Sequence, residues 1–321
     1  MPKSKTKYYR SEKQLIEMVK KAFVDLLPTE ITELTEGYFN VAYLIKLSNH
    51  QEVILKIAPP PSTPVMTYEN NMMFSEVESM KRVATETQVP VPKVLYFDDS
   101  CVICEAEYFF MEKLPGRSFA VSAKAYNEKE QDDIHRNIGK YTAMVNELTG
   151  DKFGYYGQLD KQGKNWYEVF KSMIEAIYAD AKKVDFMLRV EENQLLKLLE
   201  RDRFLFEMVT TPKLVHWDLW EGNIFIDEGE ITGIIDFERC LWADELMEFG
   251  FRTYHQKNSF FEGYGMKVLN EEQVIRAKWY DVYFFLIVSL EGEYRGYDNQ
   301  NAYHWASEML EKWLLEMERK A

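Results

Sequence analysis

The chain has 321 residues, more than the roughly 250–300 residues at which a single hydrophobic core stops growing, so we expect two lobes. Hydrophobic residues make up 46% of the sequence and aromatic residues 15%, a composition that excludes a disordered or fibrous protein. The formal net charge of −14 argues against a nucleic-acid partner, because phosphate binding needs Lys and Arg concentrated on one face.

The sequence predicts neither a membrane partner nor a secreted protein. No segment approaches the ~20 apolar residues that cross a bilayer, and residues 1–14 lack the apolar core of a secretion signal, so we expect cytoplasmic localisation. Three cysteines cannot all pair with one another. The CVIC run at Cys101 and Cys104 also lacks the second pair or nearby His that would complete a zinc site. We interpret all three as reduced thiols and expect CVIC to be extended.

The first 87 residues predict a helix, three strands, a loop and a second helix. Ser11 precedes residues 12–27, whose apolar positions recur at helical spacing. Residues 31–58 change to short β-type runs separated by the turn-like SNHQ, which favours three antiparallel strands. The proline cluster at 59–64 cannot continue a strand and predicts a loop, after which residues 67–87 again have helical periodicity.

The next segment, residues 89–114, returns to strand character and ends before Pro115 and Gly116, which we interpret as a linker. We therefore expect residues 1–112 to form an N-lobe and residues 113–321 to form a C-lobe. Helical patterns dominate the C-lobe, around 126–148, 165–185 and 190–208 and in several segments from 244 onward. The sequence thus predicts an α+β fold, with a small antiparallel sheet in the N-lobe and a mainly helical C-lobe.

One β-like segment, residues 213–238, interrupts this helical part. Its runs NIFID (223–227) and EITGIID (230–236) are separated by an acidic turn that contains a glycine. Such spacing predicts a β-hairpin. The hairpin matters because polar residues that precede and follow it would be brought to one point.

Four polar residues around this hairpin form the strongest signal for chemistry. His216, Asp218 and Asn223 stand in the pattern H-x-D-x-x-x-x-N, and Asp236 follows the second strand. Phosphoryl transfer needs a carboxylate that orients the attacking hydroxyl and accepts its proton, and oxygen ligands that hold Mg²⁺ against the phosphates. Asp218 suits the catalytic base, and Asn223 and Asp236 suit the metal ligands. A lone Asp or Asn usually sits in a turn or cap, but the four-part match favours a kinase-type site. We interpret His216 as a buried residue that fixes the loop by hydrogen bonding.

The segments VHWDLWEGNIF and GIIDFE resemble the catalytic-loop and metal-binding motifs of the aminoglycoside phosphotransferase family, whose members share the protein kinase fold. This resemblance implies a two-lobed protein-kinase-like fold with ATP and Mg²⁺ as cofactors. It also implies that Lys56, in EVILKIA, contacts the α- and β-phosphates. Glu76 would pair with this lysine, with Glu78 as the rival partner.

The segment FFMEKLPG resembles the adenine-binding hinge of the family, which implies that Met111 lies behind the adenine while the Glu112 carbonyl and the Leu114 amide bind its edge. Two features depart from protein kinases. The phosphate-covering loop TEGYFNVAY contains only Gly37 in place of a glycine-rich series, and the metal segment reads DFE, with Glu238 in place of glycine. The second departure and the absence of an A-P-E segment favour a small-molecule kinase.

These features predict an enzyme that transfers the γ-phosphoryl group of ATP to a hydroxyl group of a small molecule. One alternative from another class is a nucleotide-binding pseudokinase without turnover. Another is a metabolite kinase, since choline, ethanolamine, homoserine, methylthioribose and sugar-amine kinases share this motif set. The acceptor stays open, because variable helices build its pocket while the fold and the catalytic loop determine the reaction.

The acidic balance predicts an acceptor that is cationic or amine-bearing, as an aminoglycoside-like antibiotic is. Acidic residues cluster in ADELMEF and LEGEYRGYD, and C-terminal helices line the acceptor pocket in related folds. Glu291, Glu293 and Tyr294 are therefore candidates for holding ammonium groups by ion pairing and cation–π contact. Asp244 is a further candidate, with helix capping as its alternative role. For the acidic residues, the alternative is a solvated helix face.

Overall fold

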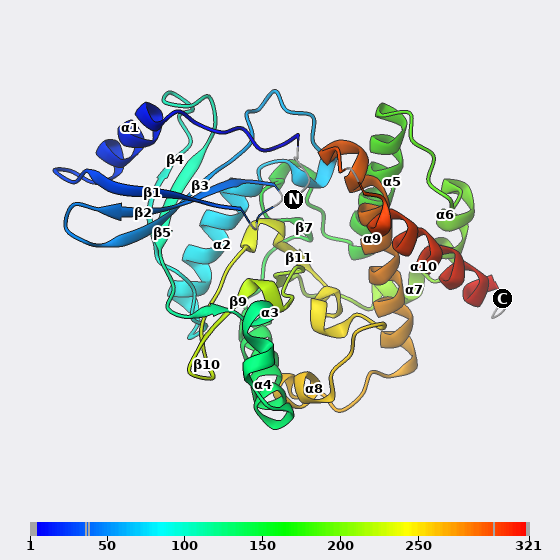
Figure 1. Ribbon diagram of the computed structural model, residues 1–321. Coiled ribbons are helices and arrows are strands. Elements are labelled where there is room, and N and C mark those ends of the chain that lie inside the picture. Colours follow the sequence, from blue (N-terminus) through cyan, green and yellow to red (C-terminus); the bar gives the residue numbers. More distant parts are fainter. Residues whose placement is uncertain (1–4, 36, 38, 298, 319–321) are drawn as a thin grey trace.

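The computed structural model describes residues 5–35, 37, 39–297 and 299–318. Figure 1 shows a sheet with two helices in the first third of the chain and a larger, mainly helical part beyond it. This is the α+β architecture that the sequence predicts. None of the helices in these described ranges is both long enough and apolar enough to cross a membrane.

The first part is built around a five-stranded antiparallel sheet with the strand order β1-β2-β3-β5-β4. Its strands are β1 (Pro28–Leu34), β2 (Val41–Leu47), β3 (Glu52–Ile57), β4 (Val94–Asp98) and β5 (Tyr108–Glu112). The three strands predicted within residues 31–58 are confirmed. Pro28 can open β1 because this strand lies at the edge of the sheet, where a missing backbone N–H is tolerated.

Helix α1 (Glu12–Ala22) covers one face of this sheet. Ser11 is its N-cap and forms a capping box with Gln14, which satisfies two backbone donors at the helix start. The helix is shorter than the predicted span of residues 12–27. It ends at Ala22 because Phe23 adopts an extended conformation and packs its ring edge-on against Phe110 of β5, with the ring centroids 5.0 Å apart.

Helix α2 (Met72–Glu86) covers the opposite face, and successive side chains of β5 point alternately to the two faces. Tyr108 and Phe110 pack with α1, whereas Phe109 and Met111 belong to a cluster that contains α2 and continues into the helical part. Strand β5 ends at Glu112, where the sequence places the lobe boundary. The division into two lobes stays a prediction, because this second cluster spans both regions.

The CVIC segment is not extended, which corrects the prediction made for it. Residues 102–106 form turns, and Cys101 and Glu105 both have φ near +55°. A chain reversal between β4 and β5 requires this conformation, and a short run with strand-like composition does not reveal it. All three cysteines are free, as predicted.

The second part holds the remaining α-helices and six short strands among the described residues. Its helices are α3 (Phe119–Ser122), α4 (Glu128–Asn146), α5 (Trp166–Lys183), α6 (Glu192–Arg201), α7 (Arg203–Glu207), α8 (Asn258–Tyr264), α9 (Glu271–Arg295) and α10 (Asn301–Glu318). The helices predicted around 126–148 and 165–185 correspond to α4 and α5. The one predicted at 190–208 is split, because Asp202 leaves the helix and accepts a hydrogen bond from Trp279 Nε1 on α9 (2.9 Å).

The short strands form two small sheets within this helical part. They are β6 (Arg117–Ser118), β7 (Gly154–Tyr155), β8 (Lys213–Val215), β9 (Ile224–Asp227), β10 (Glu230–Ile234) and β11 (Leu241–Ala243), in the orders β10-β9-β6 and β7-β11-β8. Strands β9 and β10 form the predicted hairpin, with Glu228 and Gly229 both at positive φ in its turn. The Ile235 amide donates to the Asn223 carbonyl (3.0 Å), so this hairpin brings Asn223 next to the segment that contains Asp236.

Helices α4 and α8 cross at close range because each has a glycine at the crossing. A Cβ atom on Gly139 of α4 would overlap the Phe260 carbonyl oxygen, and one on Gly263 of α8 would overlap the Arg136 carbonyl oxygen. Backbone atoms of one helix therefore occupy the place of a side chain on the other. This packing holds α8 beside the segment that follows the β9–β10 hairpin.

We predict that Gly263→Ala will lower the free energy of unfolding by about 1–3 kcal/mol, because the added methyl group must push the two backbones apart. Gly292→Ala on α9 is the matched control, since a Cβ atom there meets nothing within 4 Å. The control should stabilise the protein by about 0.5–1 kcal/mol through helix propensity. Chemical denaturation of the three proteins measures both values, and equal stability of the two variants would contradict the prediction.

Candidate active site

The catalytic loop begins where β8 ends, and its own side chains hold its shape. The Asp218 carbonyl oxygen accepts hydrogen bonds from the Trp220 amide (2.9 Å) and from Asn223 Nδ2 (2.8 Å). The amide nitrogen of Asn223 therefore points to the loop, and its carbonyl oxygen is the atom left to ligate a cation. His216 is buried and donates from Nε2 to the Ile235 carbonyl (2.9 Å), which joins the loop to the segment before Asp236.

The side chain of Asp218 is partly buried, and burial raises the pKa of its carboxyl group. Asp236 also raises this pKa, whereas Arg239 and Arg252 lower it. The Arg239 Nε atom lies 3.7 Å from Asp218 Oδ2. A carboxylate with a raised pKa is a stronger proton acceptor than an exposed one, so this environment suits a general base.

Lys56 on β3 lies between two acidic groups. Its ammonium group contacts both carboxylate oxygens of Glu76 on α2 at 2.7 and 2.8 Å, and Asp236 Oδ1 at 2.5 Å. Burial alone would lower the pKa of Lys56, but the charges of Asp236 and Glu76 outweigh burial and raise it. The rival Glu78 is instead paired with Lys81 on the exposed side of α2 (2.8 Å). The contact of Lys56 with nucleotide phosphates stays a prediction.

Three carboxylates converge next to this lysine. Ligand atoms of Glu76, Asp236 and Glu238 all lie within 4.8 Å of one another. Burial and the charge of Asp236 raise the pKa of Glu238 to about 8, so this group is held close to other negative charge. Asp236 has φ +67°, a left-handed conformation that Asp tolerates better than most residues. Hard oxygen ligands of this kind fit Mg²⁺, with Asp236 and Asn223 as the proposed pair.

The structure gives Glu238 a role that the sequence did not predict. Its carboxylate accepts a hydrogen bond from Asn40 Nδ2 (2.7 Å), which lies in the predicted phosphate-covering loop TEGYFNVAY. The metal segment is therefore tied to this loop through the residue that replaces glycine. Gly37 of the loop is described, whereas Glu36 and Tyr38 lie outside the described residues.

The hinge residues end β5 and begin the linker. The Met111 side chain is buried, and the Glu112 amide donates to the Lys93 carbonyl (3.0 Å). Leu114 packs at Gly233 of the β9–β10 hairpin, where a Cβ atom would lie 2.4 Å from Leu114 Cδ1. The adenine contacts of Met111, the Glu112 carbonyl and the Leu114 amide stay predictions.

The acidic residues predicted to hold an amine have other partners. Asp244 is buried, caps the short helix at Glu245–Met247, and accepts hydrogen bonds from Arg276 Nε and Tyr280 Oη, both at 2.7 Å. It therefore has the capping role considered as its alternative. The Tyr294 hydroxyl is buried and donates to the Asp180 carbonyl (3.0 Å).

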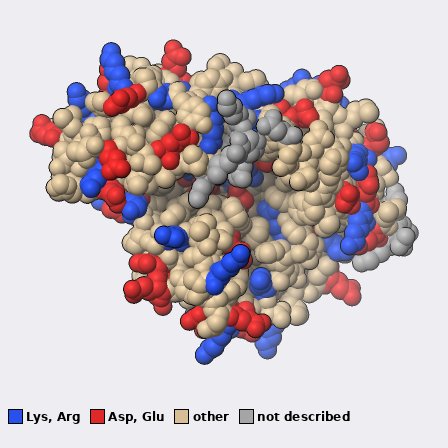
Figure 2. Space-filling view, in the orientation of Figure 1, with Lys and Arg blue, Asp and Glu red and all other residues tan. Residues whose placement is uncertain are grey.

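Glu291 lies near the catalytic loop, but its charge is already compensated. It accepts hydrogen bonds from Tyr68 Oη (2.6 Å) and Arg239 (2.8 Å), and pairs with Arg295 (3.1 Å). Glu293 is exposed on α9. On the face shown in Figure 2, acidic and basic side chains alternate, and the described residues form no continuous acidic patch. The arrangement therefore does not support the predicted amine pocket.

Two arginines near Asp218 were not found by sequence reasoning. The guanidinium groups of Arg239 and Arg252 lie 5.4 and 5.6 Å from the ring centroid of Trp217, the residue before Asp218. Arg239 could have been noticed because it directly follows the DFE segment. No local signal points to Arg252, which comes from a separate segment after the short helices at 245–251.

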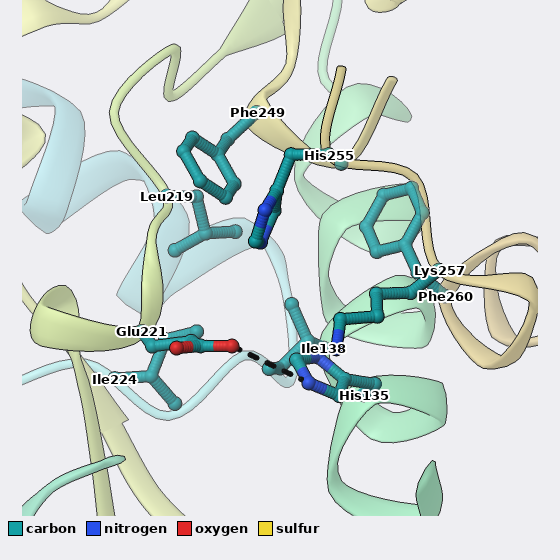
Figure 3. A pocket seen from close by; sticks show the side chains of 10 residues that line it. His135, Ile138, Leu219, Glu221, Ile224, Phe249, His255, Lys257 and Phe260 are labelled. Carbon is teal, nitrogen blue, oxygen red and sulfur yellow. Dashed lines mark ion pairs between the residues drawn. The ribbon is translucent and has the colours of Figure 1, made fainter. Parts of the chain in front are cut away.

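A cavity lies beside the catalytic loop, between this loop, α4 and the segment that leads to α8. Figure 3 shows Leu219 and Phe249 on one side of it, and the Lys257 side chain extending toward His135 on the other. Glu221 and His135 face each other across it, with 3.5 Å between Oε1 and Nε2. The cavity is thus lined by both apolar and titratable side chains, and one of them, Leu219, directly follows Asp218.

The carboxylate of Glu248 binds backbone amides of the catalytic loop, and the sequence did not predict this contact. One carboxylate oxygen accepts hydrogen bonds from the His216 amide and from Asn146 Nδ2, both at 2.9 Å, and the other accepts from the Trp217 amide (3.2 Å). Burial raises the pKa of Glu248 to about 7, although these donors oppose the shift. A buried acid therefore fixes the two residues that precede Asp218.

Comparison with known proteins identifies relatives of this arrangement. The model of the phosphotransferase enzyme family (APH) matches residues 30–271. A subtelomeric hrmA-associated cluster protein of Aspergillus fumigatus is 30% identical over 139 residues, which cover 43% of this chain and 26% of that protein. The chain spans only about a quarter of the length of the curated relatives that match it first.

Two solved structures resemble the whole chain. A thermostable mutant of the aminoglycoside phosphotransferase APH(4)-Ia has a TM-score of 0.65 at 16% identity, with 95% of this chain and 99% of that chain covered. APH(2″)-IIa, in a ternary complex with streptomycin and ATP, has a TM-score of 0.61 at 18% identity, with 97% of each chain covered. These likenesses confirm the predicted protein-kinase-like fold.

We predict that Glu248→Gln will change how stability depends on pH. The folded-state pKa of Glu248 is raised from 4.5 to about 7, so its stabilising contribution is fully present below pH 4.5 and is lost as pH rises through about 7. Gln resembles the protonated acid and cannot ionise. Relative to the parent, the variant should therefore gain stability between pH 4.5 and 7, by up to about 3 kcal/mol. Denaturation at several pH values measures this difference, and parallel curves would contradict it.

Proposed function

We propose that this chain, which belongs to the phosphotransferase enzyme family (APH), transfers the γ-phosphoryl group of ATP to a hydroxyl group of a small molecule. The match over residues 30–271 agrees with the family predicted from the motifs, and it supports the proposed phosphotransferase activity. One observation carries the specific reaction. The fold places a partly buried Asp218 beside Asn223 and Asp236, with the paired Lys56 next to them.

Each of these groups has one task in the proposed reaction. Asp218 orients the acceptor hydroxyl and takes its proton, because its raised pKa makes it the better base. Lys56 binds the non-transferred phosphates, and its pairing with Glu76 fixes its position. Glu248 and His216 hold the loop in the shape that presents Asp218. Positioning and electrostatics supply most of the acceleration in such transfers.

The metal-binding proposal rests on the chemistry of the ligand set. Asp236 supplies a charged oxygen and Asn223 a neutral one, and Glu238 adds a third acidic group within reach of Asp236. Crowded carboxylates repel one another, as the raised pKa of Glu238 indicates, so a divalent cation would stabilise their ionised forms. Asp236 and Asn223 would hold Mg²⁺, and the bound ion would supply positive charge to offset that of the phosphates.

A measurement of turnover distinguishes the kinase proposal from the pseudokinase alternative. Release of ADP is measured against a panel of aminoglycosides, macrolides, amino alcohols, hydroxy acids and sugars. A strong hit that depends on Asp218 supports the kinase proposal. Nucleotide binding without Asp218-dependent turnover on any acceptor supports a pseudokinase.

An aminoglycoside is the second candidate acceptor, favoured by the structural neighbours. APH(2″)-IIa has been solved with streptomycin and with gentamicin, and APH(2″)-IIIa with kanamycin. The ion pairs of Glu291 argue against an amine-bearing acceptor, because the Glu291 carboxylate already has two arginine partners. The same ADP-release panel decides between these acceptors.

We predict that Asp218→Asn will keep nucleotide binding but lose about 10²–10⁴-fold in turnover, because the amide preserves the shape and removes the base. Turnover is measured by ADP release and nucleotide binding by thermal shift. A variant that phosphorylates its acceptor at the parental rate would exclude Asp218 as the base.

We predict that Asp236→Ala will abolish the tightening of ATP binding by Mg²⁺, since the cation loses its charged ligand. Asn223→Ala should reduce this tightening less, because a neutral oxygen contributes less attraction. Titration of Mg²⁺ against ATP affinity measures both effects. An unchanged Mg²⁺ dependence in Asp236→Ala would remove this residue from the metal site.

A further inference from the structure

The side of the site that faces the acceptor is rich in buried positive charge. Arg239 and Arg252 both lie over the Trp217 ring, next to the loop residue Asp218. Both residues are buried, with relative exposures of 8% and 4%. The guanidinium of Arg252 also lies 3.7 Å from the ring centroid of Phe284. Aromatic rings therefore hold two cations beside the catalytic base.

Arg252 has no ion-pair partner within the described part of the chain. Its two terminal nitrogens donate to neutral groups, the Trp217 carbonyl (3.0 Å) and the Tyr254 hydroxyl (3.2 Å). The charge of Arg252 lowers the pKa of three acids, Asp218, Glu248 and Asp281, but none of these carboxylates forms a direct ion pair with it. A negative group brought by a ligand would give this guanidinium a direct ion-pair partner.

Arg239 also has unused donor capacity. Its buried Nε atom has no hydrogen-bond partner among the described residues, and the nearest acidic group, Asp218 Oδ2, is 3.7 Å away. Its Nη2 atom donates to Glu291 Oε1 (2.8 Å), and this carboxylate also contacts Arg295 and Tyr68. A guanidinium has five N–H donors and binds carboxylate or phosphate oxygens in pairs.

The neighbouring cavity shares Phe249 with the surroundings of Arg252 and carries further basic groups. Phe249 lines this cavity and also lies 5.2 Å from the Arg252 guanidinium. Exposed His255 and Lys257 also line this cavity (Figure 3). The cavity's acidic residue, Glu221, faces His135. An anionic ligand would therefore meet attractive groups from the rim of the cavity to Arg252.

We propose that the phosphate acceptor carries an anionic group, a carboxylate or a phosphate ester, which binds between Arg239 and Arg252 beside Asp218. This inference rests on the proposed kinase function and names the chemical class of its acceptor. It replaces the amine-bearing acceptor expected from the net charge. The acceptor is thus a hydroxy acid or a phosphorylated alcohol, with its hydroxyl at Asp218 and its charge at the arginines.

The test measures binding without turnover. Mg²⁺ and AMP-PNP first saturate the nucleotide site, so that an added anion cannot occupy the place of the γ-phosphate. Isothermal titration then compares four three-carbon alcohols, which are glycerol, glycerate, glycerol 3-phosphate and 3-amino-1,2-propanediol. We expect the two anions to bind at least about tenfold more tightly than glycerol and the amine. The stronger of the two identifies carboxylate or phosphate as the preferred group.

Variants locate the binding site. Arg252→Gln and Arg239→Gln should each remove most of the preference for anions, whereas Arg252→Lys should keep part of it. Arg203→Gln is the matched control, because Arg203 also lies over an aromatic ring, Tyr167, but has acidic partners on the protein surface. Unchanged AMP-PNP affinity shows that a variant is folded. Absence of a preference for anions, tighter binding of the amine, or an unchanged preference in both Gln variants would overturn the proposal.

The failure of this inference can be distinguished from the failure of the proposed function. Suppose that no acceptor is phosphorylated, that the anions bind, and that the arginine variants no longer bind them. The kinase proposal then fails and the anion-site proposal stands. If turnover is found on an amine or a neutral alcohol and the anions do not bind, the kinase proposal stands and the anion site is excluded.

Discussion

The buried ammonium group of Lys56 is the interaction on which the geometry of the site depends. It belongs to β3, and its ion pairs reach Glu76 on α2 and Asp236 after the β9–β10 hairpin. One cation thus fixes the sheet, a helix and the metal segment relative to one another. Removal of such a partner from a buried pair is strongly destabilising, because an uncompensated charge is left behind. The position of the segment that carries Asp236 therefore depends in part on a lysine that the sheet supplies.

The acceptor side is organised by local charge compensation, and the net charge of the chain is a poor guide to it. Glu291 is flanked by Arg239 and Arg295, and Arg295 is paired in turn with Glu69. The total of −14 counts every exposed acid equally, whereas binding depends on the few groups that lack a partner. Here Arg239 has a buried donor without a hydrogen-bond partner among the described residues, whereas Asp244 and Glu291, two of the acids predicted from the sequence to hold an amine, are paired with arginines.

The motifs predicted the catalytic loop because its parts lie close in sequence. Asp218, Asn223 and Asp236 are joined by a single hairpin, so their spacing alone determines that they meet. Glu248 and Arg252 could not be found in this way, because each contacts the loop from a segment more than 30 residues away with no motif of its own. The end of α1 and the turn at CVIC were missed for a related reason, since tertiary packing and chain reversal determine them.

The alternation of side chains along β5 has a consequence for how the chain can be divided. Phe109 and Met111 pack with α2 in a cluster that extends into the helical part. Tyr108 and Phe110 pack with α1 on the opposite face of the sheet. A polypeptide cut after residue 112 would keep its hydrogen-bonded sheet and expose the apolar side of α2 to water. The region that ends at residue 112 is thus unsuited to recombination as a separate module, and an exchange between relatives would have to carry the contacting helical surface with it.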